Sequence, residues 1–111
     1  MIHELRKYEA TPGRLEDLNR RFREVTLPIW ARLGIRPVAF WTSLIGPSNN
    51  ALFYLLAWDS LAEREQLWGQ FLTDAEWIRR KAETERNGVL VARAENLVLQ
   101  LTDYSPALRP R

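Results

Sequence analysis

The eight-residue segment "ALFYLLAW", residues 51–58, carries no charge and consists almost entirely of apolar side chains. It is far shorter than the roughly 20 apolar residues that a membrane-spanning helix needs. Because successive side chains of a strand point to opposite faces, a strand of this composition is apolar on both faces. Strands in the middle of a covered sheet have this pattern. The segment therefore predicts a central strand whose two faces both need cover.

The first third of the chain predicts a strand followed by a long helix. Residues 1–10 are compatible with a strand, and Thr11 is expected to cap the helix with Pro12 at its first position. Steps of three and four then define one apolar helix face, formed by Leu15, Leu18, Phe22, Val25 and Ile29. The charged residues of this segment are expected largely outside that face: Arg20, Arg21, Arg23 and Glu24. Pro28 is expected to kink the helix or to end its regular part, and Gly34 to form a left-handed cap.

The remainder predicts a hairpin, two helices and a last strand. Residues 35–46 and 51–58 read as strands, with a turn at 46–50. The S-x-x-E pattern of Ser60 and Glu63 predicts a helix start with a capping box, and Thr73 with Glu76 predicts a second one. The second helix is expected over 74–86 with a stop near Gly88, the last strand over 93–101, and a tail over 102–111.

This order of elements is that of the ferredoxin-like βαββαβ arrangement, an α+β fold with an antiparallel four-stranded sheet. Its usual strand order puts the first and third strands in the middle. We therefore expect one domain over 1–101, with the first strand in a central position. A single helical layer covers only one face of such a sheet, so the apolar third strand also predicts a homodimer formed through the sheet faces.

Composition excludes several classes of protein. The chain has 111 residues and no cysteine, so it has no disulfides, thiolate metal ligands or cysteine nucleophile. The net charge of +2 comes from interspersed acidic and basic residues, whereas nucleic-acid binding needs clustered positive charge. The N-terminal residues show no signal-peptide pattern, and no Walker, G-x-G-x-x-G or H-E-x-x-H motif is present. We expect a soluble cytoplasmic protein that binds neither nucleic acid nor membrane.

Charge on the first strand is the main functional indication. Glu4, Arg6 and Tyr8 share one face with Ile2, whereas His3 lies on the opposite face with Leu5 and Lys7. Charged residues on a central strand must be paired or line a cavity. One hypothesis is a cavity bordered by Trp41, Tyr54 or Trp58. The alternative is a structural ion pair that crosses the sheet and is closed off by a partner.

Two further residues have alternative roles. His3 is the only histidine, so it cannot build a multi-histidine zinc site. It is a candidate for proton transfer, in principle a single axial haem ligand, or simply a surface or interface histidine. Arg64 is either an anion clamp or a helix-surface arginine that pairs with Glu4, Asp59 or a partner subunit.

Several segments together resemble the NIPSNAP family. They are "HELRKYEATPGRLEDL", "AFWTSLIGPSNNALFYLLAWDSLAERE", "TDAEW" and "AEN", and the resemblance spans residues 1–101. Ala39 and Ala75 depart from it, since many members have glycine and proline there. The resemblance implies a dimeric α+β barrel in which two sheets pack face to face. Its wider superfamily includes monooxygenases, haem-degrading enzymes, isomerases and cyclases.

Two function classes follow. In the first, the protein is an enzyme that binds a small hydrophobic or aromatic molecule between sheet and helices. It would act as a monooxygenase, isomerase or cyclase without a cofactor or metal. Glu4, Tyr8 or His3 would then transfer a proton, Arg6 or Arg64 would hold an oxyanion, and the binding residues would be Trp41, Tyr54, Trp58 and Trp77. In the second, the protein is a non-catalytic structural or interaction module.

Overall fold

The computed structural model describes residues 1–108 and contains one antiparallel sheet of four strands. The strands are β1 (Ile2–Ala10), β2 (Arg36–Thr42), β3 (Ala51–Trp58) and β4 (Val91–Leu99), in the order β2-β3-β1-β4. The predicted ferredoxin-like fold is confirmed, with the first and third strands in the middle. The predicted strand 51–58 has the observed bounds of β3, since its apolar run begins and ends with the strand.

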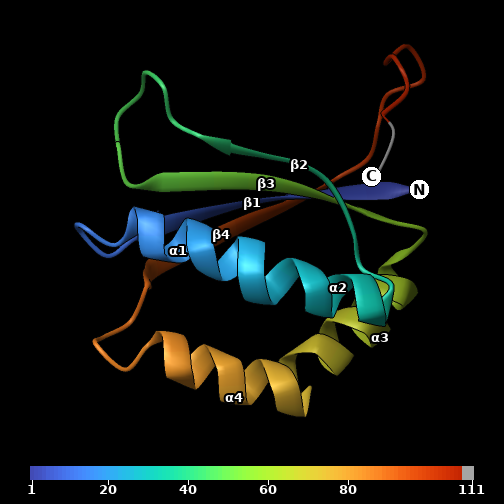
Figure 1. Ribbon diagram of the computed structural model, residues 1–111. Coiled ribbons are helices and arrows are strands. Elements are labelled where there is room, and N and C mark those ends of the chain that lie inside the picture. Colours follow the sequence, from blue (N-terminus) through green and yellow to red (C-terminus); the bar gives the residue numbers. More distant parts are fainter. Residues whose placement is uncertain (109–111) are drawn as a thin grey trace.

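All helices lie on one face of this sheet (Figure 1). They are α1 (Leu15–Arg21), α2 (Leu27–Leu33), α3 (Leu61–Leu72) and α4 (Ala75–Thr84). None of the helices within residues 1–108 has the length and apolar character needed to cross a membrane. Within residues 1–108 no helix lies over the opposite face of the sheet, where the β2–β3 connection and the tail 102–108 rise at the two ends (Figure 1).

Pro28 interrupts the first helical stretch as predicted. The segment Phe22–Thr26 between α1 and α2 is π-helical, and the N–H of Leu27 donates to the carbonyl of Phe22, five residues back. Proline lacks an N–H, and its ring crowds the carbonyl of the preceding turn. The wider π turn accommodates it without ending the helix. Gly34, at φ 87°, then forms the predicted left-handed cap.

The predicted start of this helix is wrong by several residues. Thr11 does not cap it. The N–H of Arg14 donates to the Thr11 carbonyl at 2.8 Å, and the Thr11 hydroxyl donates to the carbonyl of Val89. Pro12 and Gly13 occupy the centre of this turn, with Gly13 at φ 81°, the combination that a type II turn requires. The helix therefore begins only at Leu15.

The two predicted capping boxes have different outcomes. The Ser60 hydroxyl accepts the N–H of Glu63 at 3.1 Å, as predicted, but the Glu63 carboxylate accepts the N–H of Asp59 rather than that of Ser60. At the second box Asp74 is the cap and accepts the N–H of Trp77 at 3.0 Å. Thr73 instead donates its hydroxyl to the end of α3. Thr73 and Asp74 join α3 to α4, and Thr73 bonds to the end of α3 while Asp74 caps the start of α4.

Other boundaries shift by a few residues. β2 ends at Thr42, before the predicted 46, and β4 covers Val91–Leu99 instead of 93–101. α4 ends at Thr84, and the turn that follows runs to Gly88, whose φ is 114°. Of the predicted tail, residues 109–111 lie outside the described part.

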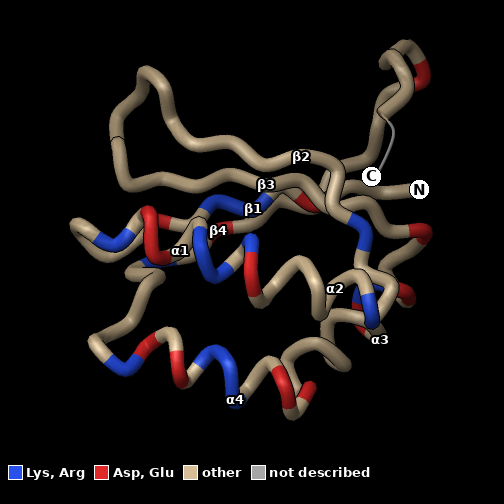
Figure 2. Tube along the Cα trace, viewed as in Figure 1, with Lys and Arg blue, Asp and Glu red and all other residues tan. Residues whose placement is uncertain are grey.

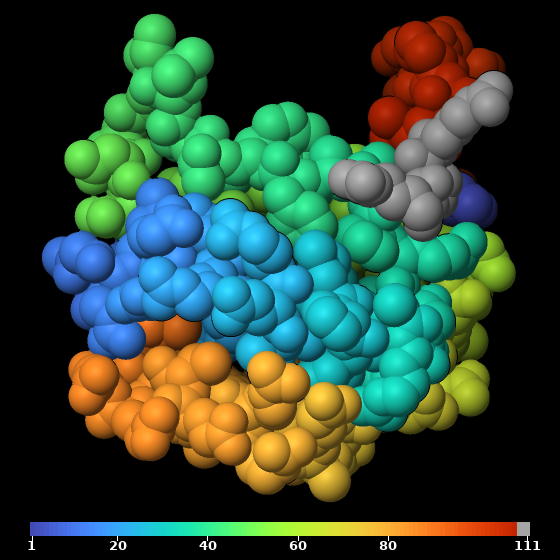
Figure 3. Space-filling view, viewed as in Figure 1, coloured from blue at the N-terminus to red at the C-terminus, as the bar shows by residue number. Residues whose placement is uncertain are grey.

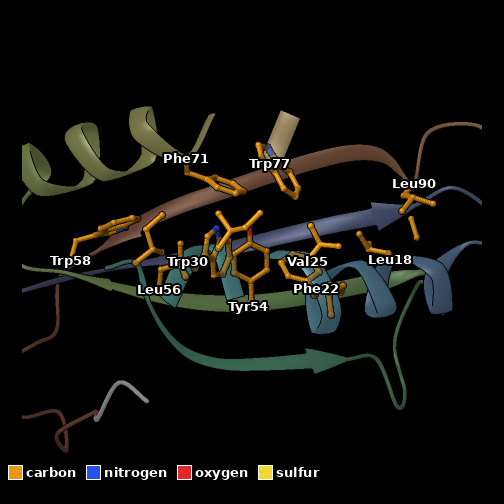
Figure 4. Packing of buried hydrophobic residues seen from close by; sticks show 14 residues of the cluster. Leu18, Phe22, Val25, Trp30, Tyr54, Leu56, Trp58, Phe71, Trp77 and Leu90 are labelled. Atoms are coloured by element: carbon orange, nitrogen blue, oxygen red, sulfur yellow. The ribbon is translucent and has the colours of Figure 1, made fainter. Parts of the chain in front are cut away.

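An aromatic core fills the space between the sheet and the helices (Figure 4). Phe71 and Trp77 lie against each other with ring centroids 4.5 Å apart, and Tyr54 lies below them on the sheet. The uncovered face is also apolar, and β2 and β3 are nearly free of charged residues (Figure 2). Its large apolar side chains are half-buried or exposed: Leu5, Trp41, Phe53, Leu55, Leu97 and Leu99. Charged residues of β1 and β4 share this face: Lys7, Glu9, Arg93 and Glu95.

Candidate functional site

The carboxylate of Glu4 is the centre of a hydrogen-bonded network beneath the helices. Glu4 is 0% exposed and accepts five hydrogen bonds. Arg64 donates from Nε at 2.7 Å and from Nη2 at 3.1 Å, and Arg6 donates from Nη1 at 2.9 Å. The indole of Trp58 and the amide of Asn96 supply the other two donors, at 3.1 and 2.8 Å. The predicted pair of Glu4 and Arg6 is therefore present.

These contacts keep Glu4 ionised. Burial raises the pKa of its carboxyl, but the hydrogen bonds from Arg64, Asn96 and Arg6 outweigh burial and bring the pKa down to about 2. The hydrogen bond to Glu4 likewise raises the pKa of Arg64. Because the carboxylate is saturated with donors and strongly acidic, it is a poor proton-transfer group. Its role in the network is to hold two guanidinium groups.

The hydroxyl groups of two tyrosines continue the network from Arg6. Arginine is only a donor, so its Nε donates to the Tyr54 oxygen at 2.8 Å. Tyr54 in turn donates to the Tyr8 oxygen, also at 2.8 Å, and Arg6 Nη2 approaches the same oxygen at 3.5 Å. Burial, followed by the neighbouring Tyr8, raises the pKa of Tyr54. The Tyr8 oxygen thus accepts from both neighbours, and within residues 1–108 its own hydrogen has no acceptor.

Tyr8 and Arg6 border a hollow of ≈ 440 Å³ between β1, β4 and the helices α3 and α4. Pockets of this volume suit small-molecule ligands. Its walls include the aromatic side chains of Trp68, Phe71 and Trp77. The guanidinium of Arg6 lies over the ring of Trp68, with its carbon 4.6 Å from the ring centroid.

Arg21 is the residue whose placement the sequence pattern predicted wrongly. It was expected largely outside the apolar face of its helix, yet it is 4% exposed and lines the hollow. Its Nη1 donates to Glu85 at 3.2 Å, its guanidinium carbon lies 5.4 Å from the ring centroid of Trp77, and its Nε has no partner within residues 1–108. The aliphatic part of an arginine can pack along apolar side chains, and here the guanidinium at its end pairs with Glu85.

The structure separates the predicted site residues into two groups. The network and hollow bring together Glu4, Arg6, Tyr8, Tyr54, Trp58, Arg64 and Trp77. His3 and Trp41 lie on the opposite face. Trp41 is 49% exposed there. His3 is 2% exposed and lies beside the tail, its two ring nitrogens have no partner within residues 1–108, and burial lowers its pKa.

Several residues of the site were not predicted. Trp68 and Phe71 follow Arg64 at steps of four and three, so helical spacing was an available indication that they share its face. Lys81 lies four residues after Trp77, so helical spacing likewise indicated that these two residues share a face. Asn96 carries no indication in the sequence, because strand pairing alone places it opposite Arg6.

Two further features bear on ligand types. Among residues 1–108, no three histidine, aspartate or glutamate side chains gather in an arrangement that could hold a metal ion. A second hollow of ≈ 430 Å³ lies on the uncovered face of the sheet and is bordered by Leu5, Phe53 and Leu97. The helix-side hollow is the one that combines aromatic walls with the hydrogen-bonding network.

Comparisons with solved structures identify relatives of the same fold. An uncharacterized NIPSNAP-like domain protein from Burkholderia xenovorans is 25% identical, with a TM-score of 0.81 over 98% of this chain and 91% of that chain. A NIPSNAP family protein from Agrobacterium tumefaciens is 26% identical, with a TM-score of 0.84 over 95% of this chain and 96% of that chain. The comparison with curated proteins gives no match.

A more distant structure shares the fold alone. It is an antibiotic biosynthesis monooxygenase, 9% identical, with a TM-score of 0.60 over 92% of this chain and 99% of that chain. Likeness of fold does not transfer a reaction. The family model described as NIPSNAP, in contrast, matches residues 3–106. The chain therefore belongs to the NIPSNAP family.

Proposed function

We propose that this NIPSNAP protein is an enzyme that binds a small aromatic molecule in the helix-side hollow. Its reaction would be of the cofactor-independent monooxygenase, isomerase or cyclase type. The observation that carries the proposal is the hydroxyl group of Tyr8. It lies on the border of an aromatic hollow, accepts from two donors and keeps its own hydrogen for a ligand.

The chemistry of the network supports stabilisation of negative charge on a ligand oxygen. Arg6 remains charged at any working pH, and the chain from Arg6 through Tyr54 to Tyr8 polarises each hydroxyl in turn. Donors that are fixed in place before the reaction stabilise an oxyanion without reorganising. In this proposal Tyr8 contacts the reacting oxygen and Arg6 supplies the charge, while Glu4 holds Arg6 in place and is itself held by Arg64.

Binding is testable by NMR through the five tryptophan indole signals. The neutral probe 2-naphthalenemethanol should shift the indole signals of Trp68 and Trp77, which line the hollow. The signal of Trp41, on the opposite face, serves as the internal control. Trp68→Ala should weaken binding, whereas Trp41→Ala should not. Saturable shifts confined to Trp41, or no saturable shift at all, would contradict the proposed function and favour a non-catalytic module.

Turnover requires a second measurement. Once a converted aromatic substrate is found by product analysis, Tyr8→Phe should lower kcat by about 100-fold or more, in the range of a lost oxyanion donor. Tyr104→Phe makes the same chemical change in the exposed tail and should leave kcat unchanged. Unaltered turnover in Tyr8→Phe would remove Tyr8 from the mechanism.

We also propose that the protein is a homodimer that buries its uncovered sheet face. Support comes from the apolar side chains on that face and from Leu44, which is 97% exposed at the β2–β3 connection. The segment 43–50 and the tail 102–108 rise at two ends of the sheet with a lower region between them (Figure 3). Exposed apolar surfaces of this kind mark association sites. A second copy would cover the ≈ 430 Å³ hollow and the sheet residues around it.

A further inference from the structure

The buried network carries more positive than negative charge. Glu4 is the only acidic partner of both Arg6 and Arg64 within residues 1–108. Arg6 is 12% exposed and Arg64 27% exposed at their side chains, so Arg64 is partly solvated while Arg6 is largely withdrawn from water. Charges removed from water are normally paired, and one guanidinium here lacks a carboxylate of its own.

The border of the hollow adds to this excess. Arg21 is balanced by Glu85, but Lys81 lies on the border and forms no ion pair within residues 1–108. Three cations therefore line the hollow, Arg6, Arg21 and Lys81, against one lining carboxylate, that of Glu85. Glu4 contacts Arg6 from outside the lining and is shared with Arg64. A cavity bordered by charge of one sign concentrates ligands of the other.

The free donors point to the same ligand chemistry. The Tyr8 hydroxyl retains its hydrogen, and Arg6 has five N–H groups, of which Nε and Nη1 are directed to Tyr54 and Glu4. The long contact of 3.5 Å from Nη2 to Tyr8 leaves that nitrogen weakly used. Two adjacent donors, one of them charged, suit an anionic oxygen better than a neutral one.

We propose, on the basis of the proposed function, that the ligand binds as an oxyanion. It is a planar aromatic molecule whose carboxylate or ionised enol or phenol oxygen accepts from Tyr8 and Arg6. Its ring lies among Trp68, Phe71 and Trp77. Its negative charge compensates the second guanidinium, which Glu4 alone does not neutralise. Neutral aromatic molecules bind to the same walls but more weakly.

Two naphthalene ligands that share the ring system and differ in charge test the inference. Dissociation constants of 2-naphthoate and 2-naphthalenemethanol are measured by calorimetry at pH 7 on the full chain. We expect the carboxylate to bind about tenfold tighter or more, a difference of about 1.4 kcal/mol, because hydrogen bonds to charged groups are stronger than those to neutral groups. A second arm titrates bound 2-naphthol by absorption: an enol-like ligand should ionise at lower pH when bound than when free.

The outcomes separate the inference from the proposed function. Equal affinities, or tighter binding of the alcohol, together with an unaltered ionisation of bound 2-naphthol, would overturn the oxyanion inference while leaving the binding function intact. If neither probe binds, the proposed function fails and the inference with it. If only the preference for the carboxylate is observed, the ligand is an aromatic acid. If only bound 2-naphthol ionises at lower pH than free 2-naphthol, the ligand is an enol or phenol.

Two variants locate the anion. Tyr8→Phe keeps the ring and should weaken 2-naphthoate by about 10- to 100-fold, with little change for the alcohol, and Tyr104→Phe is its control. Lys81→Met removes an exposed cation from the border and should weaken 2-naphthoate several-fold. Arg79→Met removes a cation from the same helix outside the hollow and should change neither affinity. Loss of alcohol binding equal to that of naphthoate in both test variants would contradict the inference.

Discussion

Replacing Glu4 with glutamine tests whether the buried carboxylate holds the network together. Glutamine has nearly the same shape, but it removes the negative charge that faces Arg6 and Arg64. Breaking a buried ion pair by removing one partner costs about 3 to 5 kcal/mol, because the remaining charge is left uncompensated. We therefore expect Glu4→Gln to lower the free energy of unfolding by at least about 3 kcal/mol at pH 7.

The pKa of Glu4 leads independently to a similar magnitude. Folding lowers this pKa from 4.5 to about 2, and each unit corresponds to about 1.4 kcal/mol, so the ionised form contributes about 3 kcal/mol. Because the folded-state pKa is the lower one, this contribution is fully present above about pH 4.5 and is lost as the pH falls toward 2. The difference between wild type and Glu4→Gln should accordingly shrink over that interval.

Urea unfolding at fixed protein concentration, followed at pH 7, 5, 4 and 3, measures this difference. Fixed concentration matters because dimerisation would add to the apparent stability. Asp103→Asn is the matched control, since it makes the same chemical change in the exposed tail, where Asp103 forms no ion pair within residues 1–108. Glu4→Gln as stable as wild type at pH 7, or a difference that stays constant down to pH 3, would refute the reasoning.

Three other changes probe the helix start, the sheet face and the network. Ser60→Ala removes the acceptor for the Glu63 N–H and should cost about 0.5 to 2 kcal/mol in thermal or urea unfolding; unchanged stability with lost naphthoate binding would show that Ser60 serves the site instead. Leu97→Glu places a charge on the exposed, uncovered face and should convert the proposed dimer to a monomer in sedimentation experiments. Ile78→Glu, on the outer surface of α4, should not. A monomeric wild type at micromolar concentration would refute the dimer. Trp58→Phe withdraws one of the donors to Glu4 and should cost about 1 to 3 kcal/mol, and an unfolding midpoint equal to that of wild type would mean that water replaces the indole.

Local patterns were sufficient for much of the fold. The uninterrupted apolar run of β3 predicted a central strand, and β3 does lie between β2 and β1. Helices cover only one of its two apolar faces. The stripe from Leu15 to Ile29 predicted the buried helix face. Boundaries were less accurate, as at Thr11 and Thr73, because several neighbouring residues can cap or turn and the choice depends on which backbone groups lie near.

The part of the candidate site that lies on β1 could be predicted from the sequence alone. Strand alternation placed Glu4, Arg6 and Tyr8 on one face and His3 on the other, since the side-chain period of a strand is two. Their charge on a central strand indicated a pair or a cavity. That part of the reasoning needed no knowledge of where distant segments pack.

The convergence on Glu4 was decided only by tertiary structure. Arg64, Trp58 and Asn96 are separated from it by 60, 54 and 92 residues, and each donates to the same carboxylate. The helices pack on the sheet face that carries Glu4, so His3 and Trp41, which lie on the other face, are separated from the hollow. Sequence periodicity assigns side chains to faces because it is a property of one element. Which faces meet, and which charges are left unbalanced between them, depends on how all the elements pack.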